Sequence, residues 1–157
     1  MKIVFASKLL VEERIEFLNI ITKAYEVTDY ICNDYPNRFN WYWGKIVPAI
    51  FKGTREVIAC TVHGKIAGVT VLKKEDGEKK ICTFLVLEEF RNQGIGTKLI
   101  EVSFEFLGTT KPLITLADYK FKMFSRIIEK YDWTQTQILP KGFYNDKYTE
   151  LVFNGMI

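Results

Sequence analysis

The stretch Phe84-Leu-Val-Leu-Glu-Glu-Phe-Arg-Asn-Gln-Gly-Ile-Gly-Thr-Lys-Leu99 is the most informative part of this sequence. It begins as an apolar strand, continues through a polar and glycine-rich turn, and opens into an amphipathic helix predicted over residues 94–107, with Gly108 suited to its C-cap. A helix that starts directly after such a turn presents free backbone N–H groups and the positive end of its dipole. The stretch therefore predicts a site for a phosphate group.

The two glycines of this turn allow the main chain to approach a pyrophosphate closely, because neither Gly94 nor Gly96 carries a side chain. Thr97 and Lys98 add a hydroxyl group and a positive charge. The alternative is an ordinary turn in which the glycines only reverse the chain. The dinucleotide fingerprint G-x-G-x-x-G and the P-loop G-x-x-x-x-G-K-[ST] both fail to fit Gly-Ile-Gly-Thr-Lys-Leu at residues 94–99, so both are excluded.

Hydrophobic periodicity predicts one mixed α/β domain over residues 1–157. Two turn pairs, His63-Gly64 and Asp76-Gly77, separate three antiparallel strands. The predicted elements are a strand at 2–5, helices at 10–25 and 36–52, strands at 56–62, 65–73 and 79–87, a helix at 94–107, a strand at 112–116, a helix at 119–131, and strands at 133–138 and 147–153. Their order is βααβββαβαββ, which predicts a largely antiparallel sheet with flanking helices.

The first predicted helix is amphipathic, whereas the second contains an internal proline. The apolar face of the first consists of Val11, Ile15, Leu18, Ile21 and Tyr25. The second begins at Pro36 and ends before Gly53, and Pro48 predicts a kink inside it, because proline has no N–H to donate to the preceding turn.

Composition excludes several classes of function. The 22 basic and 19 acidic residues give a net charge of +3 without a basic run, which argues against nucleic-acid binding. No stretch approaches about 18 consecutive apolar residues, and the N-terminus lacks a signal-peptide core, so a cytoplasmic location without membrane contact is expected. The cysteines Cys32, Cys60 and Cys82 lie far apart and outside any C-x-x-C spacing. They predict reduced thiols, and the absence of clustered ligands predicts that no metal is needed.

Residues 91–96, Arg-Asn-Gln-Gly-Ile-Gly, resemble the coenzyme A motif [QR]-x-x-G-x-[GA] of the GNAT superfamily of N-acetyltransferases. Val86-Leu-Glu-Glu-Phe90 is similar to the V-x-P-E-Y that precedes this motif, with a glutamate in place of the proline. Glu129-Lys-Tyr-Asp-Trp133 is similar to the E-K-x-G-F that ends the family's fourth helix, with an aspartate in place of the glycine. The order of elements also matches, so the resemblance covers essentially the whole chain.

The resemblance implies an acetyl-coenzyme A dependent N-acetyltransferase, which moves the acetyl group to a primary amine by direct attack in a ternary complex. Backbone amides of residues 92–97 would hold the pyrophosphate. The strand residues would pair with the pantetheine arm, where their strand splays from the one at 112–116, and would polarise the thioester carbonyl as an oxyanion hole does. The implied cofactor-binding residues are Phe84, Leu85, Val86, Arg91, Asn92, Gln93, Gly94, Ile95, Gly96 and Thr97.

The family's customary acid and base have no direct counterpart here. The positions of its base fall on Lys80 and Cys82, and its thiolate-protonating tyrosine falls on Ile128. Ser125, on roughly the same helical stripe, is the candidate proton relay, unless its hydroxyl bonds its own helix. Asp118 is the candidate base acting through water, unless it serves as an N-cap.

Two tyrosines provide an alternative. If the hydroxyl of Tyr119 or Tyr144 lies near the sulfur, it replaces these assignments. An acceptor with a terminal α-amine, whose pKa is about 7.7–8.0, is partly neutral already and needs little help from a base.

Aromatic residues are expected to border the acceptor, which the resemblance implies is a small-molecule amine or a peptide N-terminus. They suit an apolar or cationic amine; the alternative is that they are core or homodimer contacts. Phe121 and Phe124 leave open the transfer of a longer acyl group, and the missing acid and base leave open a catalytically weak or inactive acyl-coenzyme A binding or regulatory module. The aromatic residues are Tyr35, Trp41, Tyr42 and Trp43 on one side and Phe143 and Tyr144 on the other.

Overall fold

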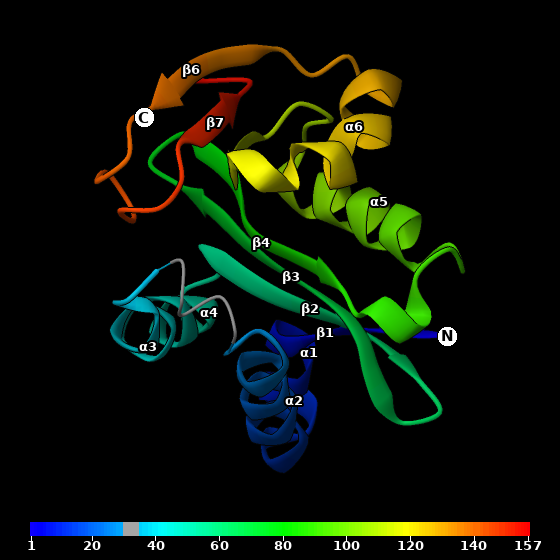
Figure 1. Ribbon diagram of the computed structural model, residues 1–157. Coiled ribbons are helices and arrows are strands. Elements are labelled where there is room, and N and C mark those ends of the chain that lie inside the picture. Colours follow the sequence, from blue (N-terminus) through cyan, green and yellow to red (C-terminus); the bar gives the residue numbers. More distant parts are fainter. Residues whose placement is uncertain (30–34) are drawn as a thin grey trace.

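The computed structural model describes residues 1–29 and 35–157, so Cys32 lies outside the described residues. Its centre is a seven-stranded sheet with the order β1-β2-β3-β4-β5-β7-β6 (Figure 1). All neighbouring strands are antiparallel except β4 and β5, which run parallel. The strands are β1 (Lys2–Phe5), β2 (Arg55–Val62), β3 (Lys65–Glu75), β4 (Glu78–Val86), β5 (Leu113–Ala117), β6 (Gln135–Leu139) and β7 (Glu150–Phe153).

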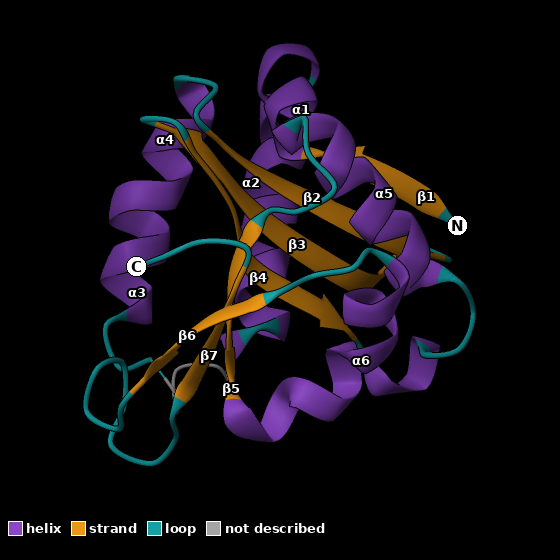
Figure 2. Ribbon diagram, turned by 90° about the horizontal axis from the view of Figure 1, so that it is seen from above, coloured by secondary structure: helices purple, strands orange, loops and turns teal. Residues whose placement is uncertain are grey.

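Helices cover both faces of the sheet (Figures 1 and 2). One face packs against the first four helices, and the other packs against the last two, so that each face has its own apolar core. The helices are α1 (Ala6–Glu12), α2 (Arg14–Val27), α3 (Arg38–Trp41) and α4 (Val47–Phe51) on the first face, and α5 (Ile95–Leu107) and α6 (Phe121–Lys130) on the second. No helix of the described residues is long and apolar enough to cross a membrane. The predicted fold class is confirmed.

The two predicted hairpin turns are confirmed. His63 and Gly64 have φ angles of 50° and 78°, and Asp76 and Gly77 have 54° and 76°. Two successive positive φ angles match the right-handed twist of the flanking strands, which explains why these dipeptides set the β2–β3 and β3–β4 registers.

The predicted first helix is present with one interruption, and its predicted apolar face is confirmed only at Ile21 and Tyr25, which pack in the core. It is interrupted at Glu13, and Val11, Ile15 and Leu18 are 84%, 86% and 59% exposed. The buried side chains of α2 are Phe17, Ile20, Ile21 and Ala24. Both stripes have helical spacing, so periodicity alone does not choose between them; packing against β2 and β3 does.

The predicted second helix is present in three pieces. A π-helical segment at Tyr42–Ile46 lies between α3 and α4, and Pro48 lies in the first turn of α4. Because proline cannot donate to the preceding turn, this position avoids a lost hydrogen bond in a helix interior. The irregularity that Pro48 predicts is therefore observed as the π-helical segment, which ends before the proline.

The sheet opens between its two parallel strands. Pairing of β4 with β5 is limited, among the described residues, to Lys80 with Leu113 and Ile81 with Ile114. Beyond these pairs, β4 continues to Val86 while β5 continues to Ala117. The main chains therefore diverge along the second half of β4, as the resemblance implied.

A buried carboxylate anchors α1 to the sheet. Glu56 of β2 is 2% exposed, and its Oε1 accepts hydrogen bonds from the backbone N–H of Ser7 at 3.0 Å and of Val57 at 3.1 Å. Its Oε2 accepts the Ser7 hydroxyl. Burial raises the pKa of Glu56, and these hydrogen bonds offset part of that rise.

The raised pKa gives a prediction about stability. Since the folded protein binds this proton more tightly than the unfolded chain, the stabilisation from Glu56 is complete below the ordinary carboxyl pKa and is lost as pH rises through the raised one. Glu56→Gln keeps an acceptor for both N–H groups but carries no charge. We expect its free energy of unfolding, relative to wild type, to improve from pH 4 to pH 8 by about 1.4 kcal/mol per unit of pKa difference.

Urea unfolding of both proteins across that pH range measures this effect. Glu101→Gln, on the exposed surface of α5, is the control for removing one surface carboxylate. A pH dependence that is identical in wild type and Glu56→Gln would contradict the prediction.

Candidate active site

A cavity of about 1060 Å³ lies where β4 and β5 diverge. Its walls come from both faces of the sheet: from the turn before α5 and from α6 on one face, and from α3 and its preceding residues on the other. Residues 80–86 of β4 and 114–117 of β5 line its middle, and Phe143 and Tyr144 line it from the loop before β7. The cavity thus connects the predicted phosphate site with the predicted acceptor side.

The turn before α5 has the geometry that anion binding requires. Gly94 is left-handed, with a φ of 82°, and it immediately precedes the first helical residue, Ile95. The N–H of Lys98 is bonded to the Gly94 carbonyl, and no described side chain caps the helix. The amides of residues 95–97 therefore precede the first intrahelical hydrogen bond, where an anion is stabilised.

Both glycines leave open space in front of the main chain. A Cβ atom built on Gly94 meets nothing within 4 Å, and one built on Gly96 meets only Val86 Cγ2 at 3.6 Å, an ordinary contact. The Arg91 Nε donates to the Val86 carbonyl at 3.2 Å and ties the turn to the end of β4.

All but two of the predicted cofactor-binding residues line the cavity. Ile95 is 2% exposed and belongs to the core under α5, and the Gln93 side chain donates to the Glu89 carbonyl at 3.4 Å. The side chains of these two residues are outside the cavity, so only their main chain remains a candidate for the cofactor.

Asp118 is not among the residues that line the cavity. Its Oδ2 accepts the Thr149 hydroxyl at 2.8 Å and the Thr149 N–H at 3.3 Å, a link between the end of β5 and the chain before β7. The Thr149 hydroxyl is the main reason that the pKa of Asp118 is lowered. A carboxylate with a lowered pKa is a weak base, so the geometry favours a structural role, although that role is not the predicted N-cap.

Ser125 also lies outside the cavity lining, and its hydroxyl donates to the Lys122 carbonyl of its own helix at 2.8 Å. Ile128 packs against the core beside α5. Neither Ser125 nor Ile128, the two side chains that the sequence places at the thiolate, therefore lines the cavity. The side chains of α6 that line the cavity are Met123, Phe124, Arg126 and Ile127.

One of the two alternative tyrosines lines the cavity. Tyr144 lines it, whereas Tyr119 does not and packs against Tyr148 at a ring distance of 4.5 Å. Burial raises the pKa of Tyr144, and the negative charge of Glu150 raises it further. The centre of the Tyr35 ring lies 5.8 Å from the centre of the Tyr144 ring. The Tyr35 hydroxyl donates to Glu150 Oε1 at 2.8 Å.

The predicted aromatic border is present in part. Tyr35, Trp41, Phe143 and Tyr144 line the cavity. Tyr42 is fully buried, and its hydroxyl donates to the Ile21 carbonyl at 2.6 Å, so it belongs to the core. Trp43 packs on Tyr25 at 5.5 Å and does not line the cavity. Among the described residues, no group of three or more His, Cys, Asp or Glu side chains is placed to hold a metal ion.

The sequence profile of the Acetyltransferase (GNAT) family matches residues 15–111, more than half of the chain. The chain belongs to the GNAT family. A search of curated protein sequences finds no match. The family match includes β4, the glycine turn and α5, which form the end of the cavity where the sequence of this GNAT protein predicts a phosphate site.

Solved structures of acetyltransferases share the fold of this GNAT protein. A putative GNAT acetyltransferase from Desulfovibrio desulfuricans is 12% identical, with a TM-score of 0.60 over 86% of this chain and 90% of that one. A putative streptothricin acetyltransferase from Bacillus anthracis, solved with acetyl coenzyme A, is 16% identical, with a TM-score of 0.58 over 72% and 69%. Nourseothricin acetyltransferase is 16% identical, with a TM-score of 0.55 over 64% of this chain and 64% of that one. This chain therefore spans less than two thirds of that protein.

Proposed function

We propose that this GNAT protein transfers an acetyl group from acetyl-coenzyme A to a primary amine by direct attack in a ternary complex. The observation that carries the proposal is the cavity itself. It extends from the free N-terminus of α5 on one face of the sheet to an end lined by aromatic side chains on the other. Two substrates that enter from opposite faces can meet in the gap between β4 and β5 without displacing each other.

The exposed edge of β4 supplies the groups that such a reaction needs. Its pairing with β5 ends at Ile81, so main-chain groups of residues 82–86 that face β5 are available to a ligand. A pantetheine arm laid along this edge would receive strand-like hydrogen bonds, and an N–H aimed at the thioester carbonyl would stabilise the oxyanion of the tetrahedral intermediate.

Tyr144 is the group that we assign to the leaving sulfur. It lines the same cavity as the exposed edge of β4, and its raised pKa keeps the phenol neutral at physiological pH. A neutral phenol donates a hydrogen bond to the thiolate as the C–S bond breaks. The proton that the amine loses passes to solvent.

A second candidate function is an acyl-coenzyme A binding module without catalysis. The observation that favours it is that no Asp or Glu is found among the described residues that line the cavity, so a carboxylate base is not in place. A cytoplasmic location, a single domain over residues 1–157 and a homodimer remain predictions under either candidate.

The test is a turnover assay in which release of free thiol from acetyl-coenzyme A is measured with a panel of amines and peptides. Amine-dependent release supports the transferase. Calorimetric binding of acetyl-coenzyme A without release across the panel would contradict it and support the binding module. Failure of acetyl-coenzyme A to bind would contradict both candidates.

A further inference from the structure

Every charged side chain that lines the cavity, among the residues that the structure describes, is a cation. No carboxylate is among the described lining residues, whereas the chain as a whole is nearly balanced in charge. The cations are Arg91 in the glycine turn, Lys120 just before α6, Arg126 within α6, and Arg38, Arg55, Lys73 and Lys80 at the other end. Phosphates of the cofactor account for cations near the glycine turn and α6, but the remaining four lie on the acceptor face.

Three of those four form a row across the sheet. Arg55 is directly opposite Lys73, and Lys73 is directly opposite Lys80, on the adjacent strands β2, β3 and β4. Side chains of directly opposed residues project from the same face, where like charges repel each other. The fold therefore accepts an unfavourable row of cations at this position.

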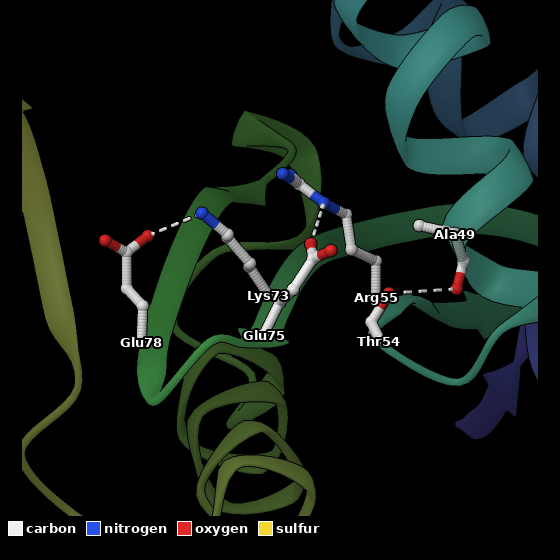
Figure 3. A network of polar contacts seen from close by, with 6 residues as sticks. All are labelled: Ala49, Thr54, Arg55, Lys73, Glu75 and Glu78. Atoms are coloured by element: carbon white, nitrogen blue, oxygen red, sulfur yellow. Dashed lines mark hydrogen bonds and ion pairs between the residues drawn. The ribbon is translucent and has the colours of Figure 1, made fainter.

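Two members of this row, Arg55 and Lys73, have an acidic neighbour (Figure 3). Lys73 Nζ is 2.9 Å from Glu78 Oε1, and Arg55 Nε is 4.0 Å from Glu75 Oε2, at the limit of an ion pair. Lys80 forms no ion pair with any described residue.

The fourth cation, Arg38, is 3% exposed and also forms no ion pair within the described part of the chain. Its Nη1 donates to the Tyr25 carbonyl at 3.4 Å, its Nη2 donates to the Thr28 hydroxyl, and its guanidinium lies 4.5 Å from the centre of the Tyr25 ring. Its Nε has no hydrogen-bond partner among the described atoms. A buried guanidinium without a carboxylate is unfavourable, and an anion in the cavity would relieve that cost.

We propose that the acceptor carries a carboxylate close to its reacting amine, as an amino acid or a short acidic peptide does. This inference rests on the proposed transferase function and narrows its substrate class. The sequence suggested an apolar or cationic amine, but the four cations repel an additional positive charge.

The same cations bear on the missing base. An ammonium group held among Arg55, Lys73 and Lys80 has its pKa lowered, because positive neighbours disfavour the charged form. The neutral amine is the nucleophile, so the row both holds the carboxylate and helps the amine to lose its proton. Glu150, whose Oε1 accepts the Tyr35 hydroxyl, does not line the cavity.

Matched acceptors test the inference. Alanyl-aspartate, alanyl-alanine amide and alanyl-lysine amide share the same reacting amine and differ in charge. We expect kcat/KM to be at least about tenfold higher for alanyl-aspartate than for either amide, since loss of one charge-assisted contact has about that effect. Equal or better turnover of the amides would overturn the inference and leave the transferase intact.

Calorimetry with the coenzyme A complex separates the inference from catalysis. Tighter binding of alanyl-aspartate than of the amides supports the inference even if no acceptor is turned over, a result that would overturn only the transferase. Equal affinities would overturn the inference.

A variant pair locates the effect. Lys80 is half-buried and lines the cavity, whereas its neighbour Lys79 is exposed and does not. In Lys80→Glu we expect the KM for alanyl-aspartate to rise at least about tenfold, with an unchanged KM for acetyl-coenzyme A. Lys79→Glu changes net charge equally and should have no effect. An equal response of both variants would overturn the assignment.

Discussion

Replacing Gly96 with phenylalanine is expected to reduce the affinity for acetyl-coenzyme A at least about 100-fold, because the ring occupies the space that the pyrophosphate needs. Loss of two charge-assisted hydrogen bonds to phosphate, each worth roughly 1.5–3 kcal/mol, accounts for that factor. The fold should tolerate the change, since a Cβ at this position meets only Val86 Cγ2 at an ordinary distance. Calorimetry with acetyl-coenzyme A measures the loss.

Gly44→Phe is the matched control. Gly44 lies in the π-helical segment, has open space around its Cβ position, and does not line the cavity. Gly96 is a better target than Gly94, because the φ of 82° at Gly94 makes any side chain strained there. If Gly96→Phe is folded, as judged by its thermal unfolding, and binds acetyl-coenzyme A as wild type does, the cofactor is not held at the start of α5.

Tyr144→Phe is expected to lower kcat about 100-fold, within the usual range for loss of a general acid, and to leave the KM for acetyl-coenzyme A unchanged. The phenol pKa is raised above its ordinary value of about 10. The proton-bearing form therefore persists to more alkaline pH, and this group should cause no fall in wild-type activity below about pH 10. Steady-state kinetics between pH 6 and pH 10 measure both effects.

Tyr148→Phe is the control for the loss of a phenol in the same loop, because Tyr148 does not line the cavity. An unchanged kcat in Tyr144→Phe would mean that water protonates the thiolate unaided. An equal loss in both variants would indicate that the loop, rather than the hydroxyl group, was disturbed.

The parts of the fold that local chemistry determines could be predicted from the sequence. Asp76 and Gly77 adopt the two positive φ angles that their residue types favour, and Gly94 marks the start of α5 for the same reason. These positions are set by the backbone preferences of a few residues, so no knowledge of distant contacts is needed.

The failures lie where distant packing decides. The two apolar stripes of α2 have equivalent spacing, and only contact with the sheet shows that Phe17, and not Ile15, is buried. For α6, Ile127 and Ile128 are both partly buried against the core, but only Ile127 is among the described residues that line the cavity. A motif fixes the order of residues along a helix, but the direction of each side chain depends on which neighbour the helix packs against.

The site shows the same division. The glycine turn before α5 is one continuous segment, so its place at the start of a helix could be predicted from the local sequence. The end of the cavity opposite the glycine turn is assembled from α3, three strands and a loop, so the presence of both Arg38 and Lys80 in its lining leaves no trace in any local pattern. Strand pairing could have suggested the row from Arg55 to Lys80, but only once the hairpin registers were known.

The short pairing between β4 and β5 also has a consequence for how the protein unfolds locally. With only Lys80–Leu113 and Ile81–Ile114 paired, β5, β6 and β7 can open as a unit while β1 to β4 stay closed. Amide hydrogens of β5 and β7 should then exchange with solvent deuterium faster than those of β3. If acyl-coenzyme A binds along β4 as proposed, it contacts both parts of the sheet and should slow that exchange, because a ligand that binds only the closed form stabilises it.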